Sequence, residues 1–283
     1  MKVPPLRYAA PATVAEAAVA LAADEDAKII AGGQSLMPLL AIRLAAPSVL
    51  VDLGRVRGLG AIEEHGDFLR IGAMATHREV VESGLIRRRA PLFAEAGRYI
   101  AHPQIRSRGT LGGALAHGDN AGEWPLALLT LGGMVEAESV RGRRTIDADD
   151  LFVGPYLTGL AADEVLTDVW ISAVASGWGF AEAARRAGDY GLALIGVRLD
   201  IEDGQCRDAR VVVGAAAGTV QRVPAAEQVL TDVPADAQTA RAAGAAAADS
   251  LTFIADIHGS AAYRRHLVAG LVERAVRQAG GIR

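Results

Sequence analysis

The stretch that decides the fold is residues 28–53, which read KIIAGGQSLMPLLAIRLAAPSVLVDL. Lys28 to Ala31 form a short apolar run that is typical of a buried strand, and Gly32-Gly33 end it. Pro38 to Leu44 favour a helix, and Val49 to Leu53 favour a second strand. The stretch therefore predicts a strand–glycine turn–helix–strand unit of the α/β type.

A capped helix is expected immediately before this unit. Thr13 to Glu16 form a capping box, in which a threonine and a glutamate three residues apart satisfy each other's backbone N–H groups. Within the run from Val14 to Ala23, four apolar residues share one helical face: Val14, Ala17, Ala18 and Leu21. Glu16 lies within this run, and only Lys2 and Arg7 are basic before it. Both features favour an amphipathic helix over the apolar segment of a signal peptide.

The pattern changes after residue 55, and helices and short strands follow one another. Strands are expected at Phe68–Ile71, Val135–Val140 and Glu164–Ile171, and helices at Thr76–Glu82, Pro91–Ala101 and Glu123–Leu131. Pro103 is expected to stop the second of these helices, and Gly109 to Gly113 to form a glycine-rich loop.

The chain restarts near Ser176 with a different pattern. Three strands of an antiparallel meander are expected at Phe180–Ala184, Ala193–Ile201 and Ala209–Ala216, followed by helices at Ala225–Leu230, Ala235–Ala248 and Ala261–Gln278. The predicted domain boundary lies near residue 175. It separates a domain of residues 1–175, with subdomains of about 1–55 and 56–175, from a C-terminal domain of residues 176–283.

Composition excludes several classes of protein. The 283 residues are 51% hydrophobic and 22% charged, which fits a packed globular chain and not a disordered one. The net charge of −4 argues against a nucleic-acid binder. Cys206 is the single cysteine, so this chain has neither an internal disulfide nor the thiolates of an iron–sulfur cluster. No apolar run is long enough for a membrane span, and we expect a cytoplasmic protein.

Two glycine pairs are the candidates for chemistry, because the Walker, Rossmann and metal-ligand motifs are absent. Gly32-Gly33 follows a strand, and Gly112-Gly113 follows an arginine-rich turn. Glycines allow backbone N–H groups to approach phosphate oxygens, and Ser35 and Thr110 would add hydroxyl donors. The chain has four Gly-Gly pairs, as many as the about three or four that chance produces at this glycine content, so plain turns remain an alternative.

The complete strings around these pairs are more specific. They are IAGGQSLMPLL at 30–40, IAHPQIRSRGTLGG at 100–113 with AHGD at 116–119 and EWP at 123–125, and ARRAGDY at 184–190. In order and spacing, over essentially the whole chain, they resemble the FAD-binding medium subunit of the molybdenum hydroxylases, the family that includes xanthine oxidase and aerobic carbon monoxide dehydrogenase.

The resemblance implies an α+β fold. It comprises a FAD-binding domain of the vanillyl-alcohol-oxidase (PCMH) type, made of two α/β subdomains, and a C-terminal domain with a three-stranded antiparallel sheet and a helical bundle. It implies that the two glycine segments surround the FAD pyrophosphate. The implied cofactor-binding residues are Ile30, Ala31, Gly32, Gly33, Gln34, Ser35, Leu36, Ile100, Thr110, Gly112, Gly113, Ala114, Glu123, Leu166, Asp189 and Tyr190. No catalytic residue and no metal ligand is expected in this chain.

One position departs from the family pattern. Some relatives carry a lysine that reaches the flavin from the strand before the Arg185-Arg186 turn, and here the matching residue is Glu182. A carboxylate does not stabilise an anionic reduced flavin as an ammonium does, so the role of this position is open. Several named residues also have plain structural interpretations: Tyr190 as a strand tyrosine, Asp189 as a turn residue and Trp124 as a core residue.

The leading functional hypothesis is an electron-transfer subunit of a heterotrimer. The resemblance implies a large partner with the molybdenum–pterin cofactor and a small partner with [2Fe–2S] clusters, arranged as a dimer of heterotrimers. FAD would pass electrons to an external acceptor, in the cytoplasm or at the inner membrane through the complex. The substrate of the complex stays open between carbon monoxide, an N-heterocycle and an aldehyde. The alternatives are a free-standing flavin oxidase of the same superfamily and a structural subunit without FAD.

Overall fold

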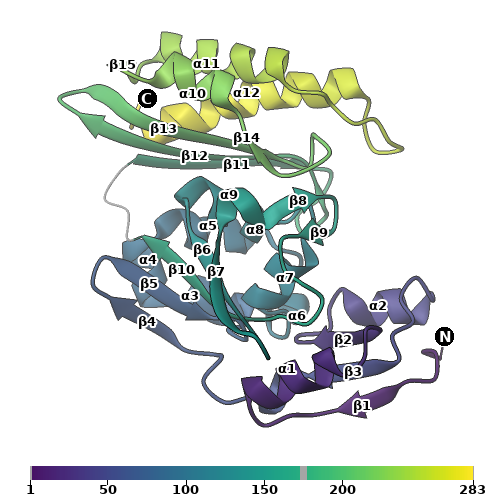
Figure 1. Ribbon diagram of the computed structural model, residues 1–283. Helices are drawn as coiled ribbons and strands as arrows, with labels where there is room; N and C mark the ends of the chain where they lie inside the picture. The colour runs from purple at the N-terminus through teal and green to yellow at the C-terminus, as the bar shows by residue number, and fades with distance from the viewer. Residues whose placement is uncertain (1, 173–176, 283) are drawn as a thin grey trace.

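The computed structural model describes residues 2–172 and 177–282, and Figure 1 shows three layers of structure. A small N-terminal subdomain lies at one end, a second α/β subdomain lies in the middle, and a sheet covered by helices lies at the other end. The predicted boundary near residue 175 lies outside the described residues.

The N-terminal subdomain is the predicted α/β unit. Its parallel sheet has the order β1-β3-β2, formed by β1 (Arg7–Ala9), β2 (Ala27–Ile30) and β3 (Val49–Asp52). The first helix, α1 (Val14–Ala22), begins at the predicted capping box and buries Ala17, Ala18 and Leu21. The second helix, α2 (Leu36–Ala41), begins two residues before Pro38 and ends three residues before Leu44, so the glycine turn leads directly into it.

The second subdomain contains a five-stranded antiparallel sheet of order β4-β5-β10-β6-β7. Its strands are β4 (Ile62–His65), β5 (Phe68–Gly72), β6 (Met134–Ser139), β7 (Gly142–Asp147) and β10 (Val165–Ser172). A 3-10 turn, η1 (Leu53–Arg55), leads into it, and a small ladder of β8 (Phe152–Gly154) and β9 (Leu157–Thr158) lies beside it. Its helices are α3 (His77–Glu82), α4 (Gly84–Arg89), α5 (Pro91–Tyr99), α6 (Pro103–Arg106), α7 (Leu111–His117), α8 (Glu123–Leu131) and α9 (Ala148–Leu151).

The helix α5 ends at Tyr99, before Pro103 as predicted, and Pro103 begins the new short helix α6, where a missing N–H has no cost. One local prediction in this subdomain was wrong. The expected glycine-rich loop at Gly109–Gly113 is instead the start of α7, whose N-cap Thr110 accepts a hydrogen bond from the Gly113 N–H.

The C-terminal domain has the predicted meander and two further short strands. The meander is β11 (Gly177–Ala184), β12 (Gly191–Glu202) and β13 (Gln205–Gly214), and β14 (Gln221–Arg222) and β15 (Val233–Pro234) both pair with β13. The helices α10 (Pro224–Leu230), α11 (Ala237–Ser250) and α12 (Ala261–Ala279) cover one face of this sheet (Figure 1). A Cβ at Gly177 or Gly179 would overlap α12 carbonyl oxygens, so these glycines allow the helix to lie directly on β11.

The other face of this sheet packs on α8 of the second subdomain. Residues 124–131 of α8 are all buried, and Leu126 and Leu128 share one hydrophobic core with Phe180, Leu194 and Val212. The approach is close, because a Cβ at Gly196 of β12 would overlap the Thr130 hydroxyl. The two domains therefore share a continuous apolar core with α8 at its centre.

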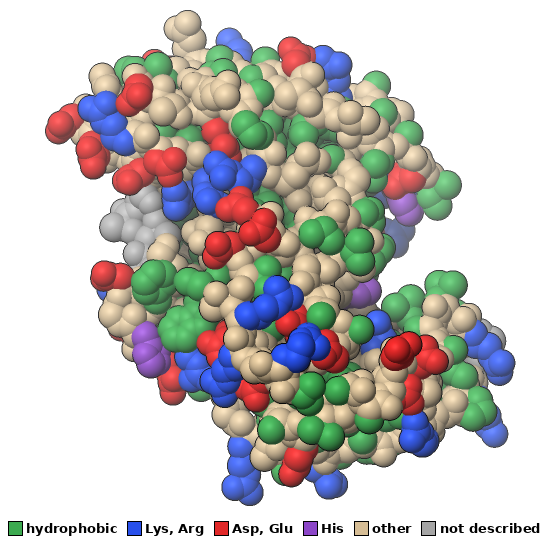
Figure 2. All heavy atoms as spheres, viewed as in Figure 1, with side chains coloured by type: hydrophobic (Ala, Val, Ile, Leu, Met, Phe, Trp, Pro, Cys, Tyr) green, Lys and Arg blue, Asp and Glu red, His purple; other side chains and the backbone are tan. Residues whose placement is uncertain are grey.

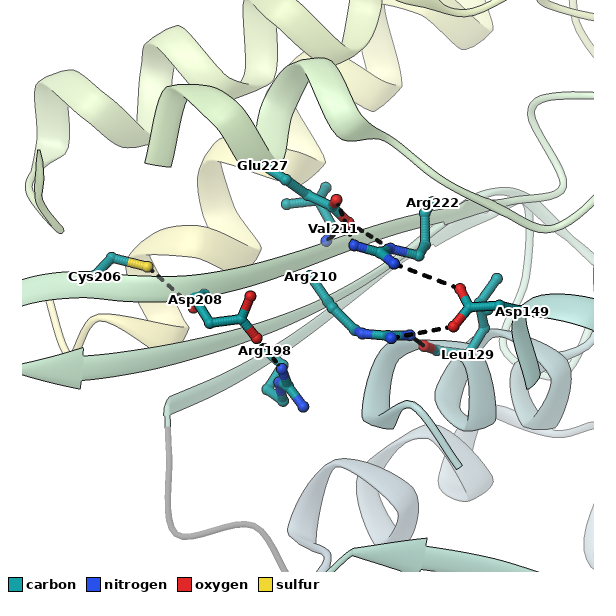
Figure 3. Close-up of polar contacts among 9 residues, drawn as sticks. All are labelled: Leu129, Asp149, Arg198, Cys206, Asp208, Arg210, Val211, Arg222 and Glu227. Carbon is teal, nitrogen blue, oxygen red and sulfur yellow. Dashed lines mark hydrogen bonds and ion pairs between the residues drawn. The ribbon is translucent and has the colours of Figure 1, made fainter. Parts of the chain in front are cut away.

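An ionic cluster joins the two domains at the C-terminal end of α8 (Figure 3). Arg210 of β13 donates one hydrogen bond to the Leu129 carbonyl oxygen at 3.1 Å and one to the Asp149 carboxylate at 3.1 Å. Arg222 lies 3.6 Å from the other Asp149 oxygen and also forms an ion pair with Glu227 at 2.8 Å. Arg210 thus brings a positive charge to the negative end of the α8 dipole from the opposite domain.

The Arg210→Ala variant should destabilise the domain contact by about 1–3 kcal/mol, because it leaves the Leu129 carbonyl and Asp149 without their charged donor. Arg207→Ala is the matched control, since Arg207 on the same strand pairs with Asp232 in solvent, and it should change stability by less than about 0.5 kcal/mol. Urea unfolding of both variants measures the difference. Equal stability of the two variants would contradict the role assigned to Arg210.

Candidate functional site

The two glycine segments of the sequence meet in space. A Cβ at Gly32 would overlap the Arg108 carbonyl oxygen and would lie 2.7 Å from the Gly109 Cα. A Cβ at Gly113 would lie 3.5 Å from the Ala31 side chain. The turn after β2 therefore lies against the start of α7, and this contact joins the N-terminal subdomain to the second subdomain. Figure 2 shows the surface hollowed on its right side, between the N-terminal subdomain and the rest of the chain.

The first segment has free backbone donors. Within residues 2–172 and 177–282, the backbone N–H groups of residues 32–35 donate no hydrogen bond. Gly33 has φ +72°, a left-handed conformation that favours glycine, and the Gln34 side-chain amide donates to the Gly32 carbonyl oxygen at 3.0 Å. Consecutive free N–H groups in a turn of this kind form an anion-binding concavity.

The second segment differs, because the N–H groups of residues 111–114 already have acceptors. The Leu111 N–H donates to the Ala75 carbonyl oxygen at 2.9 Å, and the Gly112 N–H donates to the Ala73 carbonyl oxygen at 2.8 Å. A Cβ at Gly112 would overlap the Ala73 side chain, so this glycine serves packing against the connection after β5. Of the two segments predicted to present N–H groups to phosphate, the first therefore has the run of consecutive free donors, whereas in the second only the Thr110 N–H donates no hydrogen bond among the described residues.

A buried histidine holds the second segment in place. The Trp124 indole N–H donates to His77 Nδ1 at 2.9 Å, and the His77 backbone N–H donates to the Gly109 carbonyl oxygen at 2.9 Å. Burial, together with the Arg106 charge, lowers the pKa of His77 to about 4, so the ring is neutral and accepts the indole proton. Trp124 is the core residue that the sequence analysis expected, whereas His77 was missed, because only folding brings it beside Gly109.

The remaining predicted residues lie in two kinds of environment. Ile100, at the end of α5, and Leu166, in β10, are core residues that are 8% and 5% exposed, so a ligand could reach only their edges. Asp189 and Tyr190 lie in the turn between β11 and β12, and Tyr190 is 73% exposed. Burial first, and then the charges of Asp119 and Glu123, raise the pKa of Tyr190, so the turn lies within electrostatic range of the N-terminal end of α8.

Two polar residues order the backbone near these segments. The Arg106 guanidinium donates to the Ile100 and Ala101 carbonyl oxygens at 2.8 and 2.9 Å. Asp119 is buried and accepts a hydrogen bond from the Ala121 N–H at 2.9 Å.

Among residues 2–172 and 177–282, two carboxyl groups at the domain contact form no ion pair. Glu123 is the first residue of α8, and Glu182 lies on β11. Burial first, and then the charges of Glu182 and Asp119, raise the pKa of Glu123 to about 8. Burial raises the pKa of Glu182 to about 7. Sequence reasoning singled out each residue separately but could not pair them, since they come from different domains.

Glu182 also borders an open cleft of about 600 Å³ between the two domains. The cleft runs between the region of α5 and α6 and the turn after β11, and its charged lining residues are Glu95, Arg98, His102, Arg106, Glu182 and Arg186. In the described part of the chain, no three histidine, cysteine, aspartate or glutamate side chains are grouped so that they could hold a metal ion.

Comparison with known families accounts for both domains. Residues 4–172 match the FAD binding domain in molybdopterin dehydrogenase, and residues 178–279 match the CO dehydrogenase flavoprotein C-terminal domain. The chain is a medium subunit of the molybdenum hydroxylase family. As in that family, it has a PCMH-type FAD-binding domain followed by the flavoprotein C-terminal domain.

Individual relatives of this medium subunit match over their full length. The nicotine 6-hydroxylase medium subunit of Paenarthrobacter nicotinovorans is 58% identical over 99% of each chain. A chain of quinoline 2-oxidoreductase from Pseudomonas putida 86 has a TM-score of 0.95 at 40% identity, with 100% of this chain and 99% of that chain covered. Carbon monoxide dehydrogenase from Hydrogenophaga pseudoflava gives a TM-score of 0.96 at 35% identity, over the same shares. None of the helices described combines the length and apolar character needed to cross a membrane.

The raised pKa values predict how stability depends on pH. Glu123 binds its proton more tightly when folded than at the ordinary value of 4.5, so its contribution to stability falls as pH rises and is lost above about 8. Glu123→Gln removes the ionisation. Urea unfolding should therefore show the variant gaining stability relative to wild type as pH rises from about 5 to about 9. A stability difference that is the same at both ends of this range would contradict the assignment.

Proposed function

We propose that this chain is the FAD-carrying electron-transfer subunit of a heterotrimeric molybdenum hydroxylase. The observation that carries the proposal is the contact between the two glycine segments, which presents the free N–H groups of residues 32–35 at the junction of the two subdomains. These groups suit a pyrophosphate, which needs several donors and close backbone approach. Bound FAD would accept and release electrons.

Different residues of this chain would bind different parts of FAD. The segment from Ile30 to Leu36 would donate backbone hydrogen bonds to the pyrophosphate. Thr110, Gly112, Gly113 and Ala114 would form the opposite wall, where the small side chains permit close approach. Ile100 and Leu166 would give edge contacts, and Glu123, Asp189 and Tyr190 would lie around the flavin ring, at the domain contact where ligand clefts commonly form.

The partners follow from what this chain lacks. It has one cysteine, so it cannot supply the thiolates of [2Fe–2S] clusters, and a small partner subunit would hold them. A large partner would hold the molybdenum–pterin cofactor and the substrate, two heterotrimers would associate, and an external acceptor would take the electrons from FAD. We place the complex in the cytoplasm, either free or peripheral at the inner membrane.

We further propose an N-heteroaromatic substrate for the complex. The relatives at 58% and 40% identity are named for nicotine and quinoline, whereas the carbon monoxide dehydrogenase relative is 35% identical. A free-standing oxidase is disfavoured, because the chain is 58% identical to a medium subunit over 99% of each chain. Substrate turnover by the isolated, metal-free chain would restore that alternative.

Gly33→Ala tests the pyrophosphate site. The variant places a side chain at φ +72° in the turn with the free donors, and FAD binding should weaken roughly tenfold or more, as measured by flavin fluorescence titration. Gly58→Ala is the matched control: Gly58 has φ +86° with open space around it, so the variant has the same backbone strain at a site away from the turn. Equal loss of FAD affinity in both variants would show that residues 32–35 do not belong to the FAD site.

Tyr190→Ala tests the placement of the flavin ring. Loss of a stacking phenol should weaken FAD binding by about 1 kcal/mol and change the flavin absorption spectrum, while the pyrophosphate contacts remain. Tyr190→Phe keeps the ring and should preserve both properties. If Tyr190→Ala binds FAD with the affinity and spectrum of the wild type, Tyr190 does not contact the ring.

A further inference from the structure

One short segment, residues 100–109, contacts both of the turns that we assign to the FAD site. Its last two residues, Arg108 and Gly109, form the backbone contact with Gly32. Its first residues contact the turn between β11 and β12, which carries Tyr190. The segment belongs to the second subdomain, so it meets the N-terminal subdomain at one end and the C-terminal domain at the other.

The contact with the C-terminal turn is made at Gly188. A Cβ at Gly188 would lie 2.6 Å from His102 Cε1 and 3.0 Å from the Ala101 carbonyl oxygen, so a side chain here would displace the turn or the imidazole ring. Gly188 also has φ +82°, a conformation that favours glycine. Packing along α8 places the sheet of this domain as a whole, and the Gly188 contact supports the turn itself.

Backbone hydrogen bonds within the segment fix the separation of its two ends. The Arg106 N–H donates to the His102 carbonyl oxygen at 3.0 Å, and the Gly109 N–H donates to the Ile105 carbonyl oxygen at 2.8 Å. These bonds run through α6 from one contact to the other. The segment is therefore internally bonded and compact, unlike an extended loop.

Arg106 holds the strained end of the segment. Ala101 has φ +38°, a left-handed conformation that a residue with a side chain keeps only when its surroundings stabilise it. The Arg106 guanidinium does so by donating to the carbonyl oxygens of Ile100 at 2.8 Å and Ala101 at 2.9 Å. The Ala101 oxygen that accepts this hydrogen bond is the same atom that faces Gly188. Arg106 therefore acts directly on the backbone that supports the C-terminal turn.

We propose that residues 100–109 are a spacer, which sets the position of the turn carrying Tyr190 relative to the turn at residues 32–35, with Arg106 and His102 as its positioning residues. The inference rests on the proposed function. FAD would extend from its pyrophosphate at one turn to its flavin ring at the other, so the spacer would hold the two turns at the separation that the cofactor requires. A ligand that orders one turn should then also restrict the other, because the spacer connects them.

The first test needs no cofactor. Hydrogen exchange of residues 184–191, followed in the full chain without FAD, should be roughly tenfold faster in Gly188→Ala than in the wild type. Gly204→Ala is the matched control, measured at its own turn between β12 and β13. Gly204 has φ +77° with open space around it, so this variant has similar backbone strain without a neighbour to displace, and its effect on exchange should be smaller.

A second background isolates the contact. In His102→Ala the ring no longer opposes a Cβ at position 188, so adding Gly188→Ala should accelerate exchange less than it does in the wild type. An effect of Gly188→Ala that is no larger than the effect of Gly204→Ala at its own turn, or that is the same in both backgrounds, would overturn the spacer, whether or not FAD binds.

The second test follows the constraint along the spacer. ADP contains the pyrophosphate of FAD but no flavin ring, so its proposed contacts lie at residues 32–35. In the wild type, saturating ADP should slow hydrogen exchange at residues 32–35 and also at residues 184–191. In Arg106→Ala the protection at 184–191 should be lost while that at 32–35 remains. Arg106→Lys should recover part of it, because an ammonium can donate to the same carbonyls. Arg98→Ala is the control and should match the wild type, since Arg98 lines the same cleft but pairs with Glu95.

The results with ADP distinguish the spacer from the FAD site. Protection at 32–35 without protection at 184–191 in the wild type would overturn the spacer and leave the pyrophosphate site in place. Protection at both turns that persists in Arg106→Ala would overturn the role of Arg106. Protection at neither turn would instead contradict the proposed function, and exchange in Gly188→Ala would still decide the contact with His102.

Discussion

The contact between the backbone at Gly32 and the backbone at Arg108–Gly109 is the constraint on which the rest of the site depends. No side chain fits between them, so two subdomains that share no sheet can approach to backbone distance. This approach places the turn after β2 beside the start of α7. The first N–H groups of α7 donate to Ala73, Ala75 and Thr110, and these hydrogen bonds hold the start of the helix in place. The consecutive free N–H donors belong to the turn after β2.

Helix α8 joins the second subdomain to the C-terminal domain. Its N-terminal end carries Glu123, whose charge contributes to raising the pKa of Tyr190, and its C-terminal end receives the Arg210 guanidinium at the Leu129 carbonyl. Between these ends the helix is completely buried in a core shared by both domains. The position of the β11–β12 turn over the proposed ring site is therefore set by packing along the whole helix, with the ionic cluster of Figure 3 at the far end.

Much of the fold was readable from local signals. The Thr13–Glu16 box fixed the start of α1, and the boundaries of α8 were predicted to the residue, because a polar N-terminus and a following glycine define them. The start of α7 was missed, since glycines in the sequence suggest a loop, while Thr110 capping and tertiary bonds to Ala73 and Ala75 stabilise a helix. The hydrogen bond between His77 and Trp124 and the effect of Glu182 on the pKa of Glu123 could not be predicted, because the residues come from remote segments.

The central claim is that this chain binds FAD non-covalently in the site between its two subdomains. Its most direct test is the flavin content of the purified complex, released by denaturation and counted against the amount of this chain. We predict about one FAD per chain, all of it in the supernatant after the protein is precipitated, because no covalent attachment is expected from the motifs of this sequence. Absence of stoichiometric flavin, or flavin retained on the precipitated chain, would contradict the account.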